Sequence, residues 1–219
     1  MDEKAFLARL RSSRTVLPET DSPELPTRPA LSVKQLADRL AMELEAVGGV
    51  VRRASSLGEA RKQLIETLRS ADVRRLVRTR APILEEIDLD HTFFEAGIEA
   101  TVCDARVDAR EDIRESAFSS EAGLTGVDYG VAETGTLVLL AGPAEGRAIS
   151  LVPPVHIAVL RARDIVLELG ELFECVAARD ESLPSALTFV TGPSSTADIE
   201  LVHTVGVHGP RELHLVLLD

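Results

Sequence analysis

Three short stretches in the second half of the chain combine glycine with side chains that can bind a ligand. The first, Glu133, Thr134, Gly135 and Thr136, lies between two apolar runs that read as strands. A plain hairpin favours Asn-Gly or Asp-Gly and needs no carboxylate there. Glu133 is therefore either an ordinary polar turn residue or a site residue, acting as nucleophile or general base. In a site, both threonines would bond the ligand and Gly135 would let backbone approach closely.

The second stretch, TGPSSTADIE over residues 191–200, follows an apolar strand. Gly192 allows a tight turn, and Ser194, Ser195 and Thr196 are residues that cap helices. A glycine turn that opens a helix exposes N–H groups and the positive end of the helix dipole, which suits an anion. The stretch is neither a Walker loop nor GxGxxG. A ligand site and simple helix capping both remain open.

The third stretch, GVHGPREL over residues 206–213, places His208, Gly209 and Arg211 in a loop before the last apolar strand. A histidine in such a loop bonds backbone or contacts a ligand. His203 and His208 are five residues apart with no evident third ligand. Because a zinc site needs three or four protein ligands, we predict no metal site.

The net charge of −12 comes almost entirely from the second half of the chain. An acidic protein repels phosphate backbones and anionic membranes, so neither nucleic acid nor a membrane surface is expected as the main partner. An anionic ligand would need counter-charge from backbone N–H groups or from the few arginines of this half. We assign that role to Arg147 and Arg211; the other arginines here are Arg114, Arg161, Arg163 and Arg179.

The two cysteines, Cys103 and Cys175, have neither CxxC nor zinc spacing and are predicted to be free thiols. The N-terminus is acidic and amphipathic, unlike a signal peptide. No run approaches the ~20 apolar residues of a membrane span. These features predict a cytoplasmic protein without a membrane span.

Residues 1–30 read as a short amphipathic helix followed by a proline-rich arm. Such an arm either packs on a neighbouring subunit, giving a homo-oligomer, or is a loosely held terminus. From residue 31 onwards helix and strand patterns alternate. This alternation predicts an open, mainly parallel α/β sheet that is covered on both faces.

The individual elements follow from periodicity, caps and turn residues. Predicted helices are 32–49, with Ser32 as N-cap and Gly48-Gly49 as C-cap, 56–70, with a capping box from Ser56 to Glu59, 82–97 and 162–179. One or two short helices are predicted over 109–126. Predicted strands are 49–54, 73–79, 98–104, 127–132, 137–142, 155–160, 187–190 and the end of the chain.

Four segments in this order resemble the LUD-domain family and, within it, the lactate-utilization protein C group: GVDYGVAETGTLVLLAGP, LVPPVHIAVL, ALTFVTGPSSTADIE and GVHGPRELHLVLL. The resemblance runs from about residue 31 to the end, so residues 31–219 would be one LUD α/β domain. It implies a three-layer α/β/α sandwich with a Rossmann-like, mainly parallel sheet. That fold is similar to the class of the sugar-phosphate isomerases and CoA transferases.

The resemblance also implies a function. The family belongs to a bacterial three-protein system that oxidises L-lactate to pyruvate, in which two partner proteins carry the iron–sulfur clusters. This chain would be the cluster-free member, without a cofactor of its own, and would bind a small carboxylate or other anionic ligand in a crevice at the strand ends. One alternative is a stand-alone enzyme of the CoA-transferase or isomerase type, in which Glu133 is catalytic. The other is a scaffold without a small-molecule site.

Overall fold

The computed structural model of the chain describes residue 9 and residues 30–141, 147–179, 184–197, 203–205 and 208–219. Residues 31–219 form one compact unit, separate from residues 1–30. The predicted N-terminal helix and proline-rich arm lie outside the described residues, apart from Arg9. The arm and an oligomer built through it therefore stay predictions.

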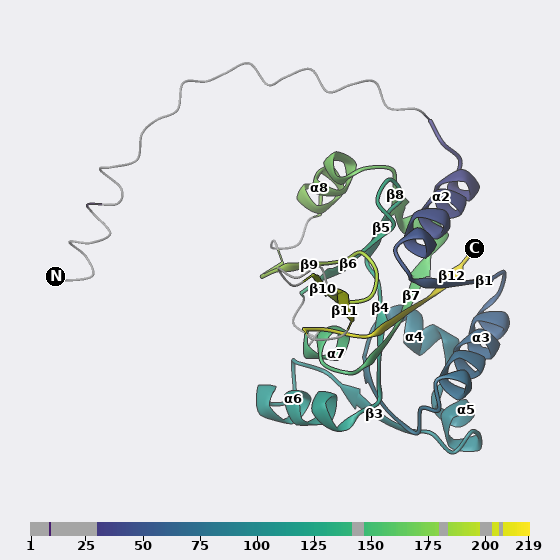
Figure 1. Cartoon of the computed structure of the whole chain (residues 1–219), viewed down its shortest axis with the longest axis vertical. Helices are drawn as coiled ribbons and strands as arrows, with labels where there is room; N and C mark the ends of the chain where they lie inside the picture. Colours follow the sequence, from purple (N-terminus) through teal and green to yellow (C-terminus); the bar gives the residue numbers. More distant parts are fainter. Residues whose placement is uncertain (1–8, 10–29, 142–146, 180–183, 198–202, 206–207) are drawn as a thin grey trace. The chain divides into compact units, whose positions relative to one another are not determined.

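The centre of the body is a six-stranded sheet in which every neighbouring pair of strands is parallel. This result confirms the predicted Rossmann-like sheet, and Figure 1 shows its strands crossing the body. Across the sheet the order is β1 (Val50–Ala54), β12 (Glu212–Leu218), β7 (Val155–Arg161), β4 (Ala122–Gly126), β2 (Arg75–Thr79) and β3 (Glu99–Cys103).

Both faces of the sheet are buried, as parallel sheets require. Along β7, Ile157 and Val159 join one core cluster, whereas Ala158 and Leu160 join another. Their alternation places one helical layer on each face. The first layer holds α3 (Leu57–Ser70), α4 (Pro82–Ile87) and α5 (Asp90–Glu95); the second holds α2 (Val33–Ala46), α6 (Arg110–Ser119) and α7 (Ala148–Leu151). The predicted three-layer sandwich is confirmed.

A second sheet, which the sequence did not predict, lies in the same layer as α2. Its order is β8 (Ile165–Val166), β5 (Tyr129–Val131), β6 (Thr136–Leu140) and β9 (Leu187–Val190). β5 is parallel to β8 but antiparallel to β6, and β6 is antiparallel to β9. Its outer side packs on α8 (Leu169–Ala177). β10 (Ser195–Ala197) and β11 (His203–Val205) form a separate antiparallel pair.

Two helix predictions were wrong in part. The segment 109–126 is helical only to Ser119, and its end is β4, a central strand of the main sheet. β4 contains two glycines, which have low strand propensity, so its pattern is weak. They are needed for packing, because a Cβ on Gly123 would run into the carbonyl oxygen of Ile149. In the segment 162–179, a 3-10 turn (Ala162–Asp164) and β8 precede the helix.

The predicted helix starts are correct in kind. The Ser32 hydroxyl accepts from the Gln35 N–H, and the Gln35 side chain accepts from the Ser32 N–H at 2.9 Å, which completes a capping box. The Ser56 hydroxyl likewise accepts from the Glu59 N–H. The predicted box is incomplete, however, because the Glu59 carboxylate accepts from the Ser55 N–H at 2.8 Å rather than from Ser56.

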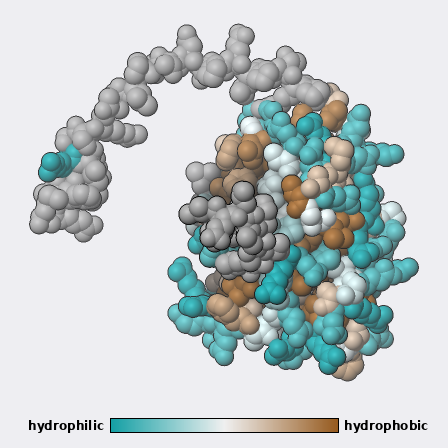
Figure 2. Space-filling model, in the orientation of Figure 1, coloured by the Kyte–Doolittle hydropathy of each residue, from teal (hydrophilic) through white to brown (hydrophobic). Residues whose placement is uncertain are grey.

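The surface of the body carries no extended apolar face in the view of Figure 2, where hydrophilic side chains predominate and hydrophobic ones form small groups. Phe94 and Phe118 are among the exposed apolar side chains. Among the described residues, no helix is long and apolar enough to cross a membrane.

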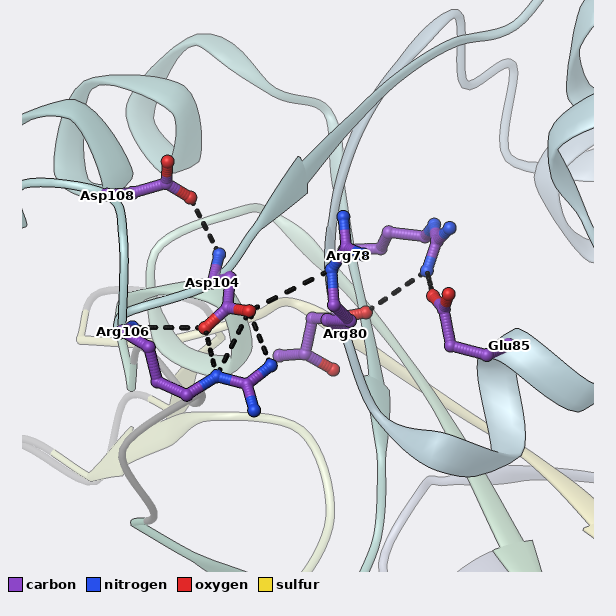
Figure 3. Close-up of polar contacts among 7 residues, drawn as sticks. Arg78, Arg80, Glu85, Asp104, Arg106 and Asp108 are labelled. Carbon is purple, nitrogen blue, oxygen red and sulfur yellow. Dashed lines mark hydrogen bonds and ion pairs between the residues drawn. The ribbon is translucent and has the colours of Figure 1, made fainter.

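A buried arginine braces the first helical layer against the sheet. Arg78 of β2 is 3% exposed, and its guanidinium donates to Glu85 of α4 at 2.7 Å and to Asp90 of α5 at 2.9 Å. Figure 3 shows this side chain directed at Glu85, while Arg106 folds back onto Asp104 beyond β3. The pairing with Arg106 lowers the pKa of Asp104 to about 2. Through Arg78, strand β2 therefore holds α4 and α5, two short helices that lack side-chain N-caps.

We expect Arg78→Met to lower the free energy of unfolding by about 2 kcal/mol, measured by urea denaturation. The loss is smaller than for a fully buried ion pair, because the carboxylates of Glu85 and Asp90 stay partly solvated after the change. Arg74→Met is the matched control: its side chain is 79% exposed, so we expect a change within about 0.5 kcal/mol. Equal losses of unfolding free energy in both variants would contradict a stabilising role for the contacts of Arg78 with Glu85 and Asp90.

Candidate functional site

The Glu133–Thr136 stretch forms the turn of the β5–β6 hairpin. Glu133 was expected in a crevice at the strand ends of the parallel sheet, and this expectation was wrong, because β5 belongs to the second sheet and pairs antiparallel with β6. The Glu133 side chain is exposed, and its backbone N–H donates to the Leu167 carbonyl at 2.9 Å. Glu133 is thus presented to solvent at a fixed turn.

Gly135 allows this turn to sit directly against the backbone of α2. Its φ is +64°, and an added Cβ would lie 2.6 Å from the carbonyl carbon of Glu43 and closer still to the nitrogen of Leu44. Only glycine combines this backbone conformation with so close a contact. The close approach expected at Gly135 does occur, but the partner is α2 rather than a ligand.

A chain of threonine hydroxyls joins the first stretch to the second. The Oγ1 atoms of Thr134 and Thr136 are 2.7 Å apart, and those of Thr136 and Thr191 are also 2.7 Å apart. Gly192 follows with φ +98° and packs against Val47 at the end of α2. The predicted tight turn at Gly192 is therefore present.

The second stretch in turn contacts the third. The Ser194 N–H donates to the Pro210 carbonyl at 2.8 Å, and a Cβ on Gly209 would lie 3.1 Å from the Ser194 Cβ. We call the residues Glu133–Thr136, Thr191–Ser195 and His208–Arg211 the three-motif surface. Several of its side chains are exposed, namely those of Glu133, Thr134, Thr191, Ser195, His208 and Arg211.

The three-motif surface lies at the amino-terminal edge of the parallel sheet. Gly192 packs on Val47, and Pro193 on Gly48, just before β1 begins. The Arg211 N–H donates to the Pro154 carbonyl at 2.7 Å, immediately before β12 and β7 begin. The predicted crevice at the strand ends assumed that β5 is a strand of the main sheet, whereas β5 belongs to the second sheet.

After Gly192 the described residues Ser195–Ala197 form strand β10, paired with β11, and not the predicted start of a helix. No helix dipole therefore acts on an anion from Ser195–Ala197. The hydroxyl of Thr196 lies outside the described side chains, as do residues 198–202 and 206–207. In the part of the chain that the structure describes, no group of three or more His, Cys, Asp or Glu residues could hold a metal ion.

Arg147 lies apart from the other predicted site residues. Its side chain is exposed and lines a small cavity of about 10 Å³, together with Leu140 and Ala141 at the end of β6. Thr136 begins the same strand, four residues or roughly 13 Å away. A cavity of this size holds about one water molecule.

A buried histidine contacts one of the residues that line this small cavity. His156 of β7 is fully buried, and its Nε2 is 2.9 Å from Oγ1 of Thr125, which lines the cavity. Burial lowers the pKa of His156 to about 4. The ring is therefore neutral at pH 7 and cannot serve as a counter-charge.

A larger cavity, of about 300 Å³, lies at the carboxyl ends of β4 and β7 and was not predicted from the sequence. Its charged lining comprises Arg161, Arg163 and Arg179 with Glu86, Asp128 and Asp164. The arginines had been noted only as scarce positive charges in an acidic half. Three of the six arginines in the second half of the chain line this one cavity. The scarcity of arginine in that half was the one feature of the sequence that could have pointed to the cavity.

Comparison with known proteins now adds to this geometry. The model of the LUD domain family matches residues 37–218, most of the chain. The chain belongs to the LUD domain family. The match extends from the second turn of α2 to the end of β12 and so includes all three stretches of the three-motif surface.

Individual relatives agree with this assignment. Lactate utilization protein C of Halalkalibacterium halodurans is 41% identical over 113 residues, which are 50% of this chain and 49% of that protein. The chain thus spans about half the length of the first curated relatives it matches. Lactate utilization protein C 1 of Bacillus mycoides is 29% identical over 205 residues, 90% of this chain and 85% of that protein.

A solved structure supports the fold alone. The crystal structure of a DUF162 family protein from Deinococcus radiodurans superposes with a TM-score of 0.61, covering 87% of this chain and 100% of that one. The sequences are 24% identical over this match. The LUD domain of this chain therefore has a known fold.

The low pKa of His156 predicts how stability depends on pH. An unfolded histidine binds protons near pH 6.5, whereas the folded one does so only near pH 4. Stability contributed by the neutral ring is thus complete above about pH 6.5 and is lost as the pH falls toward 4, by up to about 3 kcal/mol. Urea denaturation at several pH values should show a shallower decline for His156→Gln than for the wild-type chain.

The matched control is His91→Gln, whose ring is 77% exposed and should leave the decline unchanged. Other buried carboxyl groups titrate equally in all three proteins and cancel in the comparison. Identical slopes for wild type and His156→Gln between pH 6.5 and 4.5 would contradict the buried, neutral histidine.

Proposed function

We propose that this chain takes part in lactate utilization and that its three-motif surface binds a small carboxylate, L-lactate or pyruvate. The observation that carries the proposal is the convergence of three stretches that are distant in the sequence. The threonine chain links Thr136 to Thr191, and the Ser194–Pro210 bond links the second stretch to the third. The names of the relatives supply lactate as the candidate ligand.

The exposed groups of the three-motif surface suit such a ligand. The exposed Arg211 guanidinium is the cation of the third stretch and would pair with the carboxylate through a charge-assisted hydrogen bond. The hydroxyls of Thr134 and Thr191 can donate to the remaining carboxylate oxygen. Glu133 would accept a hydrogen bond from the 2-hydroxyl group, which lactate has and pyruvate lacks.

The proposal assigns the electron-transfer step to two iron–sulfur partner proteins rather than to this chain. The sulfur atoms here are poorly placed for a cluster, because Cys103 belongs to one packing cluster and Cys175 packs against another. Burial raises the pKa of both thiols, which disfavours the thiolate form that a cluster needs. Substrate binding next to cluster-bearing partners fits these features.

The test is calorimetric titration of the whole chain with L-lactate, pyruvate and propionate. We expect L-lactate to bind, and Arg211→Gln to weaken it roughly tenfold or more, since one charge-assisted hydrogen bond is lost. Glu133→Gln should reduce the preference for L-lactate over propionate while leaving propionate binding intact. Arg69→Gln, an exposed arginine at the end of α3, is the matched control.

Two outcomes would overturn the proposal. Binding of none of the three acids would favour a scaffold that acts only through its protein partners. Acyl-CoA turnover by the purified chain, lost in Glu133→Gln, would favour the CoA-transferase type of enzyme. The exposed carboxylate at a glycine-containing turn is the feature that keeps this second candidate in the comparison.

A further inference from the structure

The cavity of about 300 Å³ lies at the opposite edge of the parallel sheet from the three-motif surface. Gly126 ends β4 and Arg161 ends β7, and both line the cavity. The three-motif surface instead adjoins the residues that precede β1, β7 and β12. One small ligand cannot occupy both places.

The topology favours a ligand at this edge. From β2 the chain passes to β3 on one side, whereas from β4 it passes to β7 on the other. The sheet therefore has its switch point between β2 and β4, where the two connections diverge. Ligands of open α/β sheets bind outside the carboxyl ends of the strands at such a point. Ala81 and Pro82, which follow β2, and Gly126 and Val127, at the end of β4, line the cavity there.

Three arginines line the cavity. Arg161, whose side chain is 20% exposed, pairs with Glu86 of α4. Arg163 follows in the 3-10 turn, with its Nε 3.8 Å from Asp164, and Arg179 comes from the segment after α8. Guanidinium forks match the oxygen geometry of phosphates and carboxylates. Glu86, Asp128 and Asp164 balance the formal charge of the three arginines, so the cavity offers an oxyanion guanidinium donors rather than a net positive charge.

Two carboxyl groups provide the complementary polar contacts. Asp128 is fixed in place, because its Oδ2 accepts from the Leu140 N–H at 2.8 Å. Burial raises the pKa of Asp128, and burial also raises that of Asp164. If the arginines hold the anionic end of a ligand, the carboxyl groups beside them can accept hydrogen bonds from the hydroxyl groups of the same ligand.

The volume sets the size of the ligand. Three hundred cubic ångströms correspond to about ten water molecules at the volume each occupies in the liquid, roughly 30 Å³. They also match the lower end of the range for organic ligand sites. A three-carbon acid such as lactate would leave most of this space to water. The lining includes apolar groups, Pro82 and Ile83 among them, which suits the carbon skeleton of a larger molecule.

We propose that this cavity is a second binding site, which takes a hydroxyl-bearing organic oxyanion larger than lactate. Arg161 and Arg163 hold the oxyanion, and Asp128 bonds the hydroxyl groups. The oxyanion is a phosphate or a carboxylate, so a sugar phosphate and a sugar acid share the required chemistry. The inference does not depend on lactate binding at the three-motif surface.

The test is calorimetric titration of the whole chain with D-ribose 5-phosphate, D-gluconate, inorganic phosphate and D-ribose. We expect one of the first two to bind, which identifies the oxyanion, and to bind at least tenfold more tightly than phosphate or ribose. Arg163→Gln should weaken this binding roughly tenfold. Because the Arg163 side chain is exposed, we expect Arg163→Gln to fold as the wild-type chain does. A thermal melt of the variant checks that it is folded.

Further variants assign the contacts. Asp128→Asn should reduce the advantage of the sugar compound over inorganic phosphate, because it removes a hydroxyl acceptor but no cation. Arg69→Gln, outside both sites, should bind as wild type does. The proposal is overturned if neither sugar compound binds, or if binding is unchanged in both Arg163→Gln and Asp128→Asn. Lactate titrations of the same variants test the three-motif surface separately, so either site can fail alone.

Discussion

The arrangement of the three-motif surface depends on the close packing of the second sheet against α2. Gly130 packs on Leu40, Gly135 on the backbone at Leu44, and Gly192 on Val47, so glycines meet α2 along its length and at its end. A side chain at Gly135 would collide with helix backbone, which cannot move aside as a flexible side chain can. This packing places the β5–β6 turn next to Thr191, so that the hydroxyl groups of Thr134, Thr136 and Thr191 form their hydrogen-bonded chain. The glycines that the sequence analysis read as ligand contacts are therefore first of all packing residues.

Local signals predicted much of the fold. The Ser32 cap, the left-handed Gly48 after Val47, and the apolar periodicity of the first half led to correct helices and a correct parallel sheet. The errors came where packing overrides pattern. Gly123 weakens the strand pattern of β4, which was predicted as part of a helix, yet this glycine is required by the close approach of Ile149. β8 has only two residues, too few for periodicity to reveal a strand, and without it β5 was taken for a strand of the main sheet.

The candidate site could be predicted only in part, for a similar reason. The resemblance grouped the three stretches, and the structure brings them together, but no local pattern could show that they meet at the amino-terminal edge. Arg147, grouped with them for its charge, lies at the other end of β6. The convergence of Arg161, Arg163 and Arg179 depends on strand order, which one sequence does not reveal. The account thus places two ligand sites on opposite edges of one sheet.

The most direct test of two separate sites is a map of backbone amide NMR shifts during titration with two probes. The account predicts that L-lactate shifts the amides of Thr134, Thr191 and Gly209. It predicts that whichever sugar compound binds, D-ribose 5-phosphate or D-gluconate, shifts those of Gly126, Asp128 and Arg163. Each probe should leave the chemical shifts of the other set of amides unchanged. Shifts of one common set of amides by both probes would contradict the account, because a single site would then bind both molecules.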